Sequence, residues 1–306
     1  MTRRWLAIVN PVAGAGRTRR RYGALHEAMV ARGLRIEVVH TQYAGDATHL
    51  ARDAHGFDGV LAVGGDGTLN EVLNGLRVDN APLLAIAPLG TGNDFARRLG
   101  LPTEPHRLAD LIVRAPVQRV RIGEVVFEKG GAQRTHRFLN GAGMGLDAAV
   151  LDCLPRGIPP ALAYLVGTLR ALPRFRAQEA TAELDGQTLR GRHLLLYAGL
   201  GTHAGGGMCL TPHATNDDRL AVTLISEVPV WRLLGALPAL YQGRIGRLPW
   251  ITCVTARQVH FEAPGWGIEA DGQRLGAHRA TLRVLPWRLP IVAENDGEAD
   301  NGVLPS

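Results

Sequence analysis

The sequence predicts an α/β plus all-β fold. The expected architecture is a doubly wound, Rossmann-like α/β domain at the N-terminus and an antiparallel β-sandwich domain at the C-terminus. In the first 116 residues, short apolar runs alternate with helical patterns, as in a parallel sheet covered by helices. Polar, glycine-rich segments follow these runs. From about Val117, short alternating runs separated by turns favour an antiparallel sandwich.

The elements of the first domain follow from this rhythm. Val60–Val63 is apolar on both faces, as in a strand of a buried parallel sheet. In such sheets ligands bind beyond the carboxyl ends of the strands, where the glycine-rich loops 10–16, 41–46, 64–68 and 88–94 fall. The other expected strands are Trp5–Val9, Leu34–His40 and Leu83–Ala87, and the expected helices are Arg17–Arg32, Asp46–His55, Thr68–Leu76 and Asp94–Leu99.

The second half is expected to hold short strands and two apolar helices. The helices, Pro160–Leu172 and Val230–Tyr241, either cap the sandwich core or line an opening for a greasy substrate. The domain boundaries are placed at 1–116, 117–290 and 291–306. The last strands of the second domain could return to the first, and the acidic tail is expected to be disordered. The expected strands are Gln118–Ile122, Thr181–Leu184, His193–Ala198, Leu220–Ser226, Val259–Phe261 and Ala280–Leu285.

Composition describes an ordinary globular protein. Hydrophobic residues make up 46% of the 306 residues, and charged residues make up 20%. No apolar run approaches the roughly 20 residues that a membrane-spanning helix needs, and the apolar N-terminal stretch is too short for a signal peptide. Three widely spaced cysteines suggest neither a zinc site nor a disulfide framework. A cytoplasmic location is therefore expected.

Lysine is nearly absent from the chain. The net charge of +6 comes from arginine, and Lys129, in an expected hairpin loop, is the only lysine. A P-loop, a protein kinase and a pyridoxal enzyme each need a lysine in a motif that this chain lacks. Bound phosphates must therefore rely on backbone amides, hydroxyls, arginine and metal.

Two basic runs, Arg17–Arg21 and Arg97–Arg98, have two interpretations. They are solvated helix faces, or they attract a triphosphate or an anionic membrane surface. Aromatic residues make up only 5% of the chain, and none interleaves a basic stripe, which argues against nucleic-acid binding.

The segment Gly64–Glu71 turns from the third strand into the third helix. Its glycines would let a phosphate approach the backbone N–H groups. Thr68 and Glu71 have the spacing of a capping box. Asp66, at the tip of the turn, could coordinate a metal or accept a proton. A tight turn with a solvated aspartate is the alternative.

Six segments follow one another in a set order and spacing: Asn10–Gly16, Gly64–Glu71, Gly90–Arg97, Asn140–Asp147, Gly205–Met208 and Glu269–Gly272. Together they resemble the motifs of the diacylglycerol kinase catalytic domain, most closely in the soluble bacterial lipid kinases. Sphingosine and ceramide kinases share this domain. The resemblance covers nearly the whole chain. It implies an NAD kinase/diacylglycerol kinase-like fold with an active site between its two domains, and transfer of the ATP γ-phosphoryl group to a lipid hydroxyl.

The resemblance also implies cofactors and residue roles. The cofactors are ATP and Mg²⁺, which bridges the phosphates. Asp66 acts through magnesium or as a base, and Asp271 is a second carboxylate of the site unless it is a plain hairpin turn. The implied nucleotide contacts are Asn10, Pro11, Ala13, Gly14, Thr41, Gly64, Gly65, Asp66, Gly67, Thr68, Asn70, Glu71, Thr91 and Asn93.

The first departure from the family pattern is Gln273, at the position of a catalytic glutamate in many relatives. That glutamate is proposed as the proton acceptor, and an amide cannot accept a proton at neutral pH. Either Asp66 or Asp271 suffices, Glu269 substitutes, or turnover is slow.

The second departure concerns a structural magnesium site of the bacterial relatives. The matching residues are Thr215, Asp218 and Leu220, with Arg219 in place of a glycine and Asp217 added. Two carbonyl oxygens and a carboxylate suit a hard cation, but Arg219 could instead pair with an aspartate.

These features predict an ATP- and Mg²⁺-dependent lipid kinase that acts on a diacylglycerol-like alcohol and contacts an anionic membrane surface peripherally. The sequence does not give the oligomeric state. An NAD kinase-like enzyme shares the turn and the two-domain plan, although Asn70–Glu71 and the Gly90–Ala96 loop favour a lipid kinase. A catalytically weak nucleotide-binding regulator is the other alternative, because of Gln273.

Overall fold

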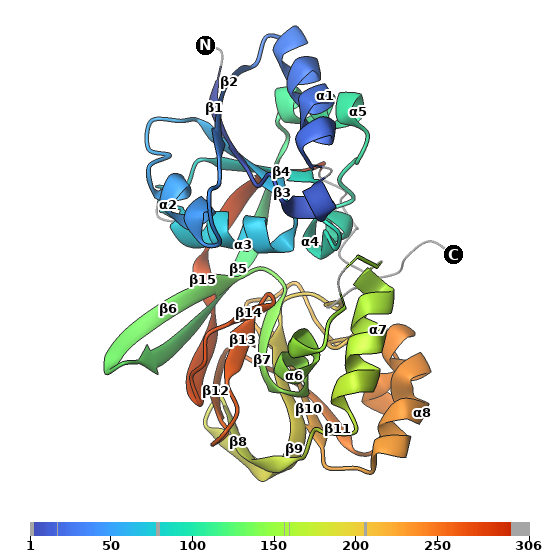
Figure 1. Ribbon diagram of the computed structural model, residues 1–306. Coiled ribbons are helices and arrows are strands. Elements are labelled where there is room, and N and C mark those ends of the chain that lie inside the picture. Colours follow the sequence, from blue (N-terminus) through green and yellow to red (C-terminus); the bar gives the residue numbers. More distant parts are fainter. Residues whose placement is uncertain are drawn as a thin grey trace. The chain divides into compact units, whose positions relative to one another are not determined.

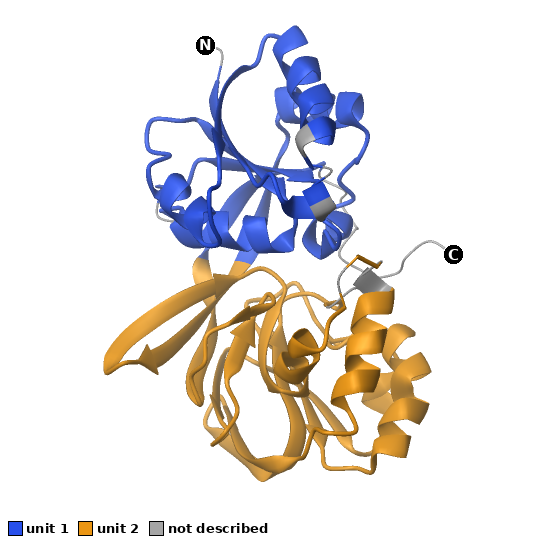
Figure 2. Cartoon of the chain, in the orientation of Figure 1, with its two compact units in different colours: residues 1–121, 287–301 blue, residues 122–286, 302–306 orange. Residues whose placement is uncertain are grey.

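A computed structural model of the chain describes residues 3–16, 18–77, 80–155, 157–158, 160–204 and 207–294. The chain divides into two compact units (Figure 2). Unit 1 comprises residues 1–121 and 287–301, and unit 2 comprises residues 122–286 and 302–306. Parts of four predicted features lie outside the described residues: Arg17 of the first basic run and first helix, Gly205 and Gly206 of one motif, and the tail from residue 295.

Unit 1 is built on a parallel sheet. Its strands are β1 (Arg4–Val9), β2 (Arg35–His40), β3 (Gly59–Gly64) and β4 (Leu83–Pro88), in the order β4-β3-β1-β2. Its helices are the 3₁₀ helix η1 (Ala13–Gly16) and α1 (Thr18–Ala31), α2 (Asp46–Arg52), α3 (Asp66–Gly75), α4 (Asp94–Arg98) and α5 (Pro105–Arg114). Helix α1 packs with α5, and α2 packs with α3 (Figure 1).

The burial of unit 1 explains why its strands form. Every residue of β3 and β4 is buried, which suits uninterrupted apolar runs in a sheet covered on both faces. The strands and the first four helices agree with the predicted ones to within a few residues. Helix α5 is an addition: the Glu104 carboxylate accepts the N–H groups of His106 and Arg107, and Pro105 occupies the first turn.

Unit 2 contains antiparallel strand pairs. The path runs β14-β13-β7-β9-β8-β12-β15, while β10 pairs with β9 and β11, and β5 pairs with β6 and β15. The strands are β5 (Val117–Lys129), β6 (Ala132–Phe138), β7 (Gly141–Gly145), β8 (Gln178–Leu184), β9 (Gln187–Gly199), β10 (Leu220–Ser226), β11 (Ile251–Ala256), β12 (Gln258–Glu262), β13 (Ile268–Ala270), β14 (Gln273–Arg274) and β15 (Arg279–Val292). The helices are α6 (Leu146–Asp152), α7 (Pro160–Ala171), α8 (Val230–Tyr241) and the 3₁₀ helix η3 (Ile245–Arg247).

The strands of unit 2 separate two hydrophobic cores. Met144, Leu196 and Phe261 belong to the first core. Tyr197 belongs to the second, together with Leu233 of α8 and the partly buried Tyr164 of α7. Both apolar helices therefore help to cover the second core, as the capping interpretation predicts. Lys129 ends β5 as expected for the edge of a hairpin loop, and its Nζ donates to Leu275 O at 3.2 Å.

Two strands are divided between the units, β5 after Arg121 and β15 after Pro286. The last part of β15 pairs in parallel with β4 through Ile291 and Leu84. Residues 291 and 292 are therefore part of a strand rather than of the expected tail.

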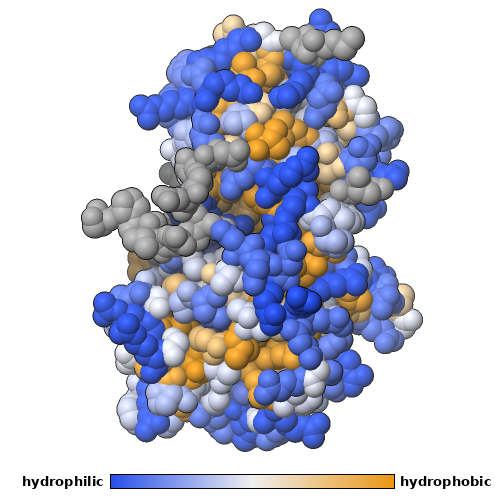
Figure 3. All heavy atoms as spheres, turned by 180° about the vertical axis from the view of Figure 1, so that it is seen from behind, coloured by the Kyte–Doolittle hydropathy of each residue, from blue (hydrophilic) through white to orange (hydrophobic). Residues whose placement is uncertain are grey.

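The surface mixes hydrophilic and hydrophobic side chains on the face seen in Figure 3. Within the described segments, no helix is both long enough and apolar enough to cross a membrane.

Candidate active site

Glycine-rich loops of unit 1 meet beyond the carboxyl ends of β3 and β4. The N–H groups of Leu89 and Gly90 each donate to Gly64 O at 2.9 Å. A methyl group on Gly90 would lie 2.3 Å from Gly65 Cα, and one on Gly14 would lie 2.4 Å from Leu89 O. Side chains at these positions would force the loops apart, so glycine is required for their close approach.

Asp66 joins two of these loops. It begins α3, and its carboxylate accepts the N–H groups of Asp94 at 3.1 Å and Phe95 at 3.3 Å at the start of α4. A methyl group on Gly92 would lie 2.7 Å from Asp66 Oδ2. Asp66 is only half-buried. Its carboxylate therefore both fixes the start of α4 and remains accessible to solvent at the edge of the loops.

The residues after Asp66 bond to neighbouring loops instead of capping their own helix. Helix α3 begins at Asp66 without a side-chain cap, so the capping box predicted for Thr68 and Glu71 is wrong. Thr68 Oγ1 accepts a hydrogen bond from Asn10 Nδ2 at 3.0 Å, and Glu71 Oε1 accepts one from Gly45 N–H at 2.9 Å. These bonds connect loops 10–16, 41–46 and 64–68.

Two residues predicted to contact the nucleotide, Asn93 and Asn70, instead bond within their own loop or are buried. Asn93 has φ of 56°, and its Nδ2 donates to Pro88 O at 3.1 Å and Gly90 O at 3.0 Å, which closes its loop. Asn70 in α3 is 1% exposed. We therefore expect both residues to shape the loops around a ligand.

The exposed edge of the loops has the features of a phosphate site. Gly67 and Thr91 are exposed, and a methyl group on Gly67 would meet nothing within 4 Å. Gly67 lies in the first turn of α3, whose dipole and N–H groups favour anions. The remaining predicted contacts in the adjoining loops are half-buried: Pro11, Ala13 and Thr41. The loops therefore fit a nucleotide bound through its phosphates.

Carboxylates at this edge fit a phosphate-bound magnesium ion. In the described part of the chain, no group of three or more His, Cys, Asp or Glu side chains could hold a metal alone. Magnesium in phosphoryl-transfer sites is usually held by substrate phosphates with one or two carboxylates. Asp66 and Asp94 supply carboxylates where α3 and α4 begin.

Arg97 and Arg98 are engaged within their own segment. Arg97 Nη1 donates to Gly92 O at 2.7 Å, and its guanidinium forms an ion pair with Asp94. The Arg98 guanidinium lies over the Phe95 ring, 4.6 Å from its centre. These contacts support the helix-face interpretation of this basic run.

Asp271 in unit 2 occupies the turn between β13 and β14, with φ of 45°. Its carboxylate accepts three backbone N–H groups, from Leu139 at 2.7 Å, Asn140 at 3.0 Å and Gly141 at 3.1 Å. The turn is thus attached to the connection between β6 and β7. Gln273 follows at the start of β14 and is half-buried.

Asp147, a half-buried acidic residue whose Oδ2 atom is buried, has no role in the sequence-based prediction. Burial raises the pKa of Asp147 and raises the pKa of Glu269 well above its usual range. The sequence signal for Asp147 is only its place at the end of the glycine-rich motif 140–147.

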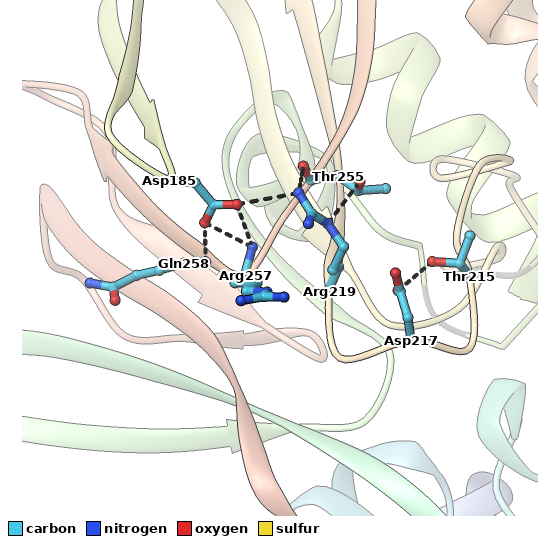
Figure 4. A network of polar contacts seen from close by, with 7 residues as sticks. All are labelled: Asp185, Thr215, Asp217, Arg219, Thr255, Arg257 and Gln258. Carbon is cyan, nitrogen blue, oxygen red and sulfur yellow. Dashed lines mark hydrogen bonds and ion pairs between the residues drawn. The ribbon is translucent and has the colours of Figure 1, made fainter.

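In the loop that carries the predicted structural metal site, Arg219 contacts Asp185 and Thr255 (Figure 4). Arg219 forms an ion pair with Asp185 at 3.3 Å and donates to Thr255 Oγ1 and Thr255 O, each at 3.1 Å. Asp217 accepts a hydrogen bond from Thr215 Oγ1 at 2.5 Å. The aspartate that pairs with Arg219 here thus lies outside the loop, in the turn between β8 and β9.

The Asp185 carboxylate is the anchor of this network. Burial alone would raise its pKa, but hydrogen bonds from the N–H groups of Gln258 and Arg257 outweigh burial, and the pKa is lowered. The predicted metal residues Thr215 and Asp218 are exposed, whereas Leu220 is buried at the start of β10. The backbone carbonyl oxygens of Thr215 and Leu220 and the carboxylate of Asp218 are ligand types that suit a hard cation.

Two family models cover most of the chain. Residues 4–125 match the diacylglycerol kinase catalytic domain, and residues 141–293 match the YegS C-terminal NAD kinase beta sandwich-like domain. These matches confirm the predicted fold class.

Individual proteins match over most of their length. A "Probable lipid kinase YegS-like" of Pseudomonas fluorescens is 34% identical over 87% of this chain and 91% of that protein. A "Diacylglycerol kinase" of Bacillus subtilis is 34% identical over 69% of each chain. Among solved structures, a diacylglycerol kinase from Bacillus anthracis has a TM-score of 0.71 at 24% identity, covering 96% of this chain and 97% of that one. The last similarity shows a shared fold.

Proposed function

Because the chain belongs to the family with the diacylglycerol kinase catalytic domain, we propose that it transfers the ATP γ-phosphoryl group to a diacylglycerol-like lipid, giving a phosphatidic-acid-like product. Membership of this family supports a kinase activity, and we propose ATP as the phosphoryl donor and a diacylglycerol-like lipid as the acceptor. The observation that carries it is the group of lysine-free glycine loops held together around Asp66. Phosphoryl transfer depends mainly on positioning and charge neutralisation, which such loops can provide.

We assign the ATP phosphates to the exposed edge of loops 64–68 and 88–94. Backbone N–H groups at the start of α3 and the Thr91 hydroxyl would position them there. Bound magnesium would neutralise charge on the phosphates, and Asp66 and Asp94 would hold the ion. The other nucleotide contacts remain as the family resemblance implies.

The proton of the lipid hydroxyl needs an acceptor or an organising charge. Asp66 is our candidate, because its half-buried carboxylate lies at the edge assigned to the phosphates. The Asp271 oxygens already accept three N–H groups, so we give Asp271 the role of holding the turn. Gln273 can orient a hydroxyl by hydrogen bonding, but it cannot take the proton.

A lipid panel tests the proposal. Folded protein with ATP and Mg²⁺ is offered dispersed diacylglycerol, sphingosine, ceramide and monoacylglycerol, with NAD as a non-lipid acceptor. We expect a labelled phospholipid from diacylglycerol and no product without Mg²⁺. Labelled NADP with no labelled lipid would instead establish the NAD kinase alternative. No product from any acceptor would exclude catalysis under these conditions.

Gln273→Glu, run in the same panel, distinguishes a weak enzyme from a regulator. The substitution restores the acid that many relatives carry at this position. We expect wild-type activity to be measurable and the variant to change it by less than about tenfold, since Asp66 carries the main charge. A rise from undetectable activity would establish a degenerate site instead.

The structural magnesium site at Thr215, Asp218 and Leu220 also remains a proposal. Its support is the exposed oxygen-rich loop and the engagement of Arg219 with Asp185 and Thr255. Mg²⁺ added without nucleotide should raise the melting temperature of the wild type. No rise at saturating Mg²⁺ would argue against the site.

We further propose that α7 and α8 form the surface that contacts an anionic membrane, placing the enzyme peripherally at the cytoplasmic face. Four large apolar side chains are exposed on them: Leu162 (48%), Leu169 (45%), Trp231 (66%) and Leu234 (39%). Their spacing, seven residues in α7 and three in α8, places each pair on one helix face. Neither helix contains an acidic residue, and α7 and α8 include Arg170 and Arg232, respectively.

Trp231 tests this surface. The Arg232 guanidinium lies 5.2 Å from the centre of the Trp231 ring, a combination suited to the interface with anionic lipid. Trp231→Ala should weaken binding to phosphatidylglycerol vesicles about tenfold in sedimentation assays. Val30→Ala, a substitution of an apolar residue in unit 1 that is 49% exposed, is the matched control and should change nothing. Equal binding of wild type and Trp231→Ala would contradict the assignment.

A further inference from the structure

A polar cluster lies on one face of β7 in unit 2. Alternate residues of β7 are glycines, and the residues between them belong to the first core. A methyl group on Gly141 would lie 2.2 Å from Tyr197 Oη, and one on Gly143 would lie 2.1 Å from Asp147 Oδ2. The glycines therefore make room for a hydroxyl and a carboxyl group against the strand.

Asp147 and Glu269 face each other in this cluster. Glu269 is 6% exposed and pairs with Gly143 in the β13–β7 register. Because Asp147 Oδ2 lies against Gly143, the strand partner of Glu269, both carboxyl groups are on the same side of the β7–β13 pair. Asp147 Oδ1 accepts the Ala148 N–H at 2.7 Å, but the buried Oδ2 receives no hydrogen bond from the described residues. A proton shared between the carboxyl groups would supply the missing donor.

The surroundings favour such a shared proton. Burial, followed by the Asp147 charge, raises the pKa of Glu269 well above its usual range, and burial also raises the pKa of Asp147. Two neighbouring carboxylates shielded from water would repel each other strongly. The titratable and charged groups around the pair are Tyr164 of α7, Tyr197 of β9, Asp271 after β13 and Arg274 of β14. The Ala148 N–H and the charge of Arg274 favour the charged form of Asp147, but burial outweighs them and its pKa is raised.

The pair is connected to the turn that carries Asp271 and Gln273. Glu269 Oε2 accepts the Gly272 N–H at 2.8 Å. Beyond the turn, Arg274 forms an ion pair with Asp152 of α6 at 2.5 Å. Arg274 also donates to the backbone oxygen of Ala148 in α6. Helix α6 thus contacts the turn region through Asp147, Ala148 and Asp152.

We propose that Asp147 and Glu269 are positioning residues whose shared proton fixes the turn 271–273 for phosphoryl transfer. This inference rests on the proposed function, which makes that turn part of the reacting site. When the shared proton is lost, the two carboxylates repel and Glu269 no longer holds Gly272 in place. Turnover should therefore fall as the pH rises above neutral.

Infrared difference spectroscopy tests the shared proton without relying on activity. The wild type at pH 7 should show a protonated-carboxyl band that disappears on alkaline titration. Asp147→Asn combined with Glu269→Gln should remove this band, because the pair then has no carboxyl group left to hold the proton. A wild-type spectrum without such a band would overturn the proposal even if the protein proves to be an active kinase.

The pH dependence of stability gives a second readout. A carboxyl group with a raised pKa in the folded state keeps a proton that the unfolded chain releases, so its stabilising effect is lost as pH rises from about 4 upward. Asp147→Asn removes one such group. Its melting temperature relative to the wild type should therefore increase from pH 5 to pH 9. A constant difference would contradict the shared proton.

The activity profile then tests the positioning role. At pH 7, Asp147→Asn should keep kcat within about fivefold of the wild type, because the amide still donates to Glu269. The alkaline fall in wild-type kcat should be absent in this variant and in Glu269→Gln. Asp152→Asn, on the same helix but bonded to Arg274, is the matched control and should keep the fall. An alkaline limb unchanged by Asp147→Asn would refute the role, whereas failure of the wild type in the lipid panel would refute only the proposed function.

Discussion

Asp66→Asn should reduce the rate of phosphoryl transfer to lipid at least ~100-fold, the lower range for loss of a group that handles a proton or developing charge. The substitution removes a negative charge from the edge where the glycine loops meet. The asparagine oxygen can still accept one of the two N–H groups at the start of α4. The free energy of unfolding should therefore fall by only ~0.5–2 kcal/mol. Single-turnover transfer from labelled ATP and thermal unfolding measure the two effects.

Asp185→Asn is the matched control for this experiment. Like Asp66, Asp185 accepts two backbone N–H groups, here from Arg257 and Gln258, but it belongs to unit 2, whereas the glycine loops belong to unit 1. We expect a comparable loss of stability with transfer unchanged. If Asp66→Asn turns over like the wild type, Asp66 serves only to hold α4, and the chemistry must be assigned elsewhere.

Gly90→Ala should destabilise the protein by roughly 3 kcal/mol and abolish ATP binding. The added methyl group would lie 2.3 Å from Gly65 Cα and 2.8 Å from Gly65 N. Both atoms are backbone, so no side-chain rotation can relieve the contact, and the two loops must separate. Urea unfolding and ATP binding by calorimetry should report both losses.

Gly67→Ala, in the loop that faces the Gly90 loop, should weaken ATP binding without destabilising the protein. A methyl group there meets nothing within 4 Å, and alanine in a helix is favoured over glycine by up to ~1 kcal/mol. The variant should unfold at the same or a higher urea concentration, yet bind ATP more weakly if phosphate lies against Gly67. Unchanged ATP affinity would move the phosphate site away from the start of α3.

The sheet of unit 1 is readable from sequence because β3 and β4 are continuous apolar runs with glycine-rich loops after them. The family resemblance, carried by the order of the motifs, is confirmed by the two family models. Helix α6 is harder to predict, because its seven residues directly follow a glycine-rich strand. Short segments carry too little periodicity to identify a helix.

The site shows where spacing along the chain is insufficient. Thr68 and Glu71 have the pattern of a capping box, but Asn10 and Gly45 from distant loops bond to these side chains instead. Asp271 accepts backbone N–H groups from residues about 130 positions earlier, a contact that no local pattern encodes. Propensity is a weak guide where tertiary partners compete for the same polar atoms.

The distribution of basic residues also has a practical consequence for labelling. Lys129 is the only lysine, and its Nζ lies at the end of β5, within 3.2 Å of Leu275 O. An amine-reactive fluorophore would therefore modify one side chain, in unit 2, besides the terminal amine. Such a label would leave every residue proposed to bind ATP chemically unchanged, and it would report on the segment that follows the Asp271–Gly272 turn.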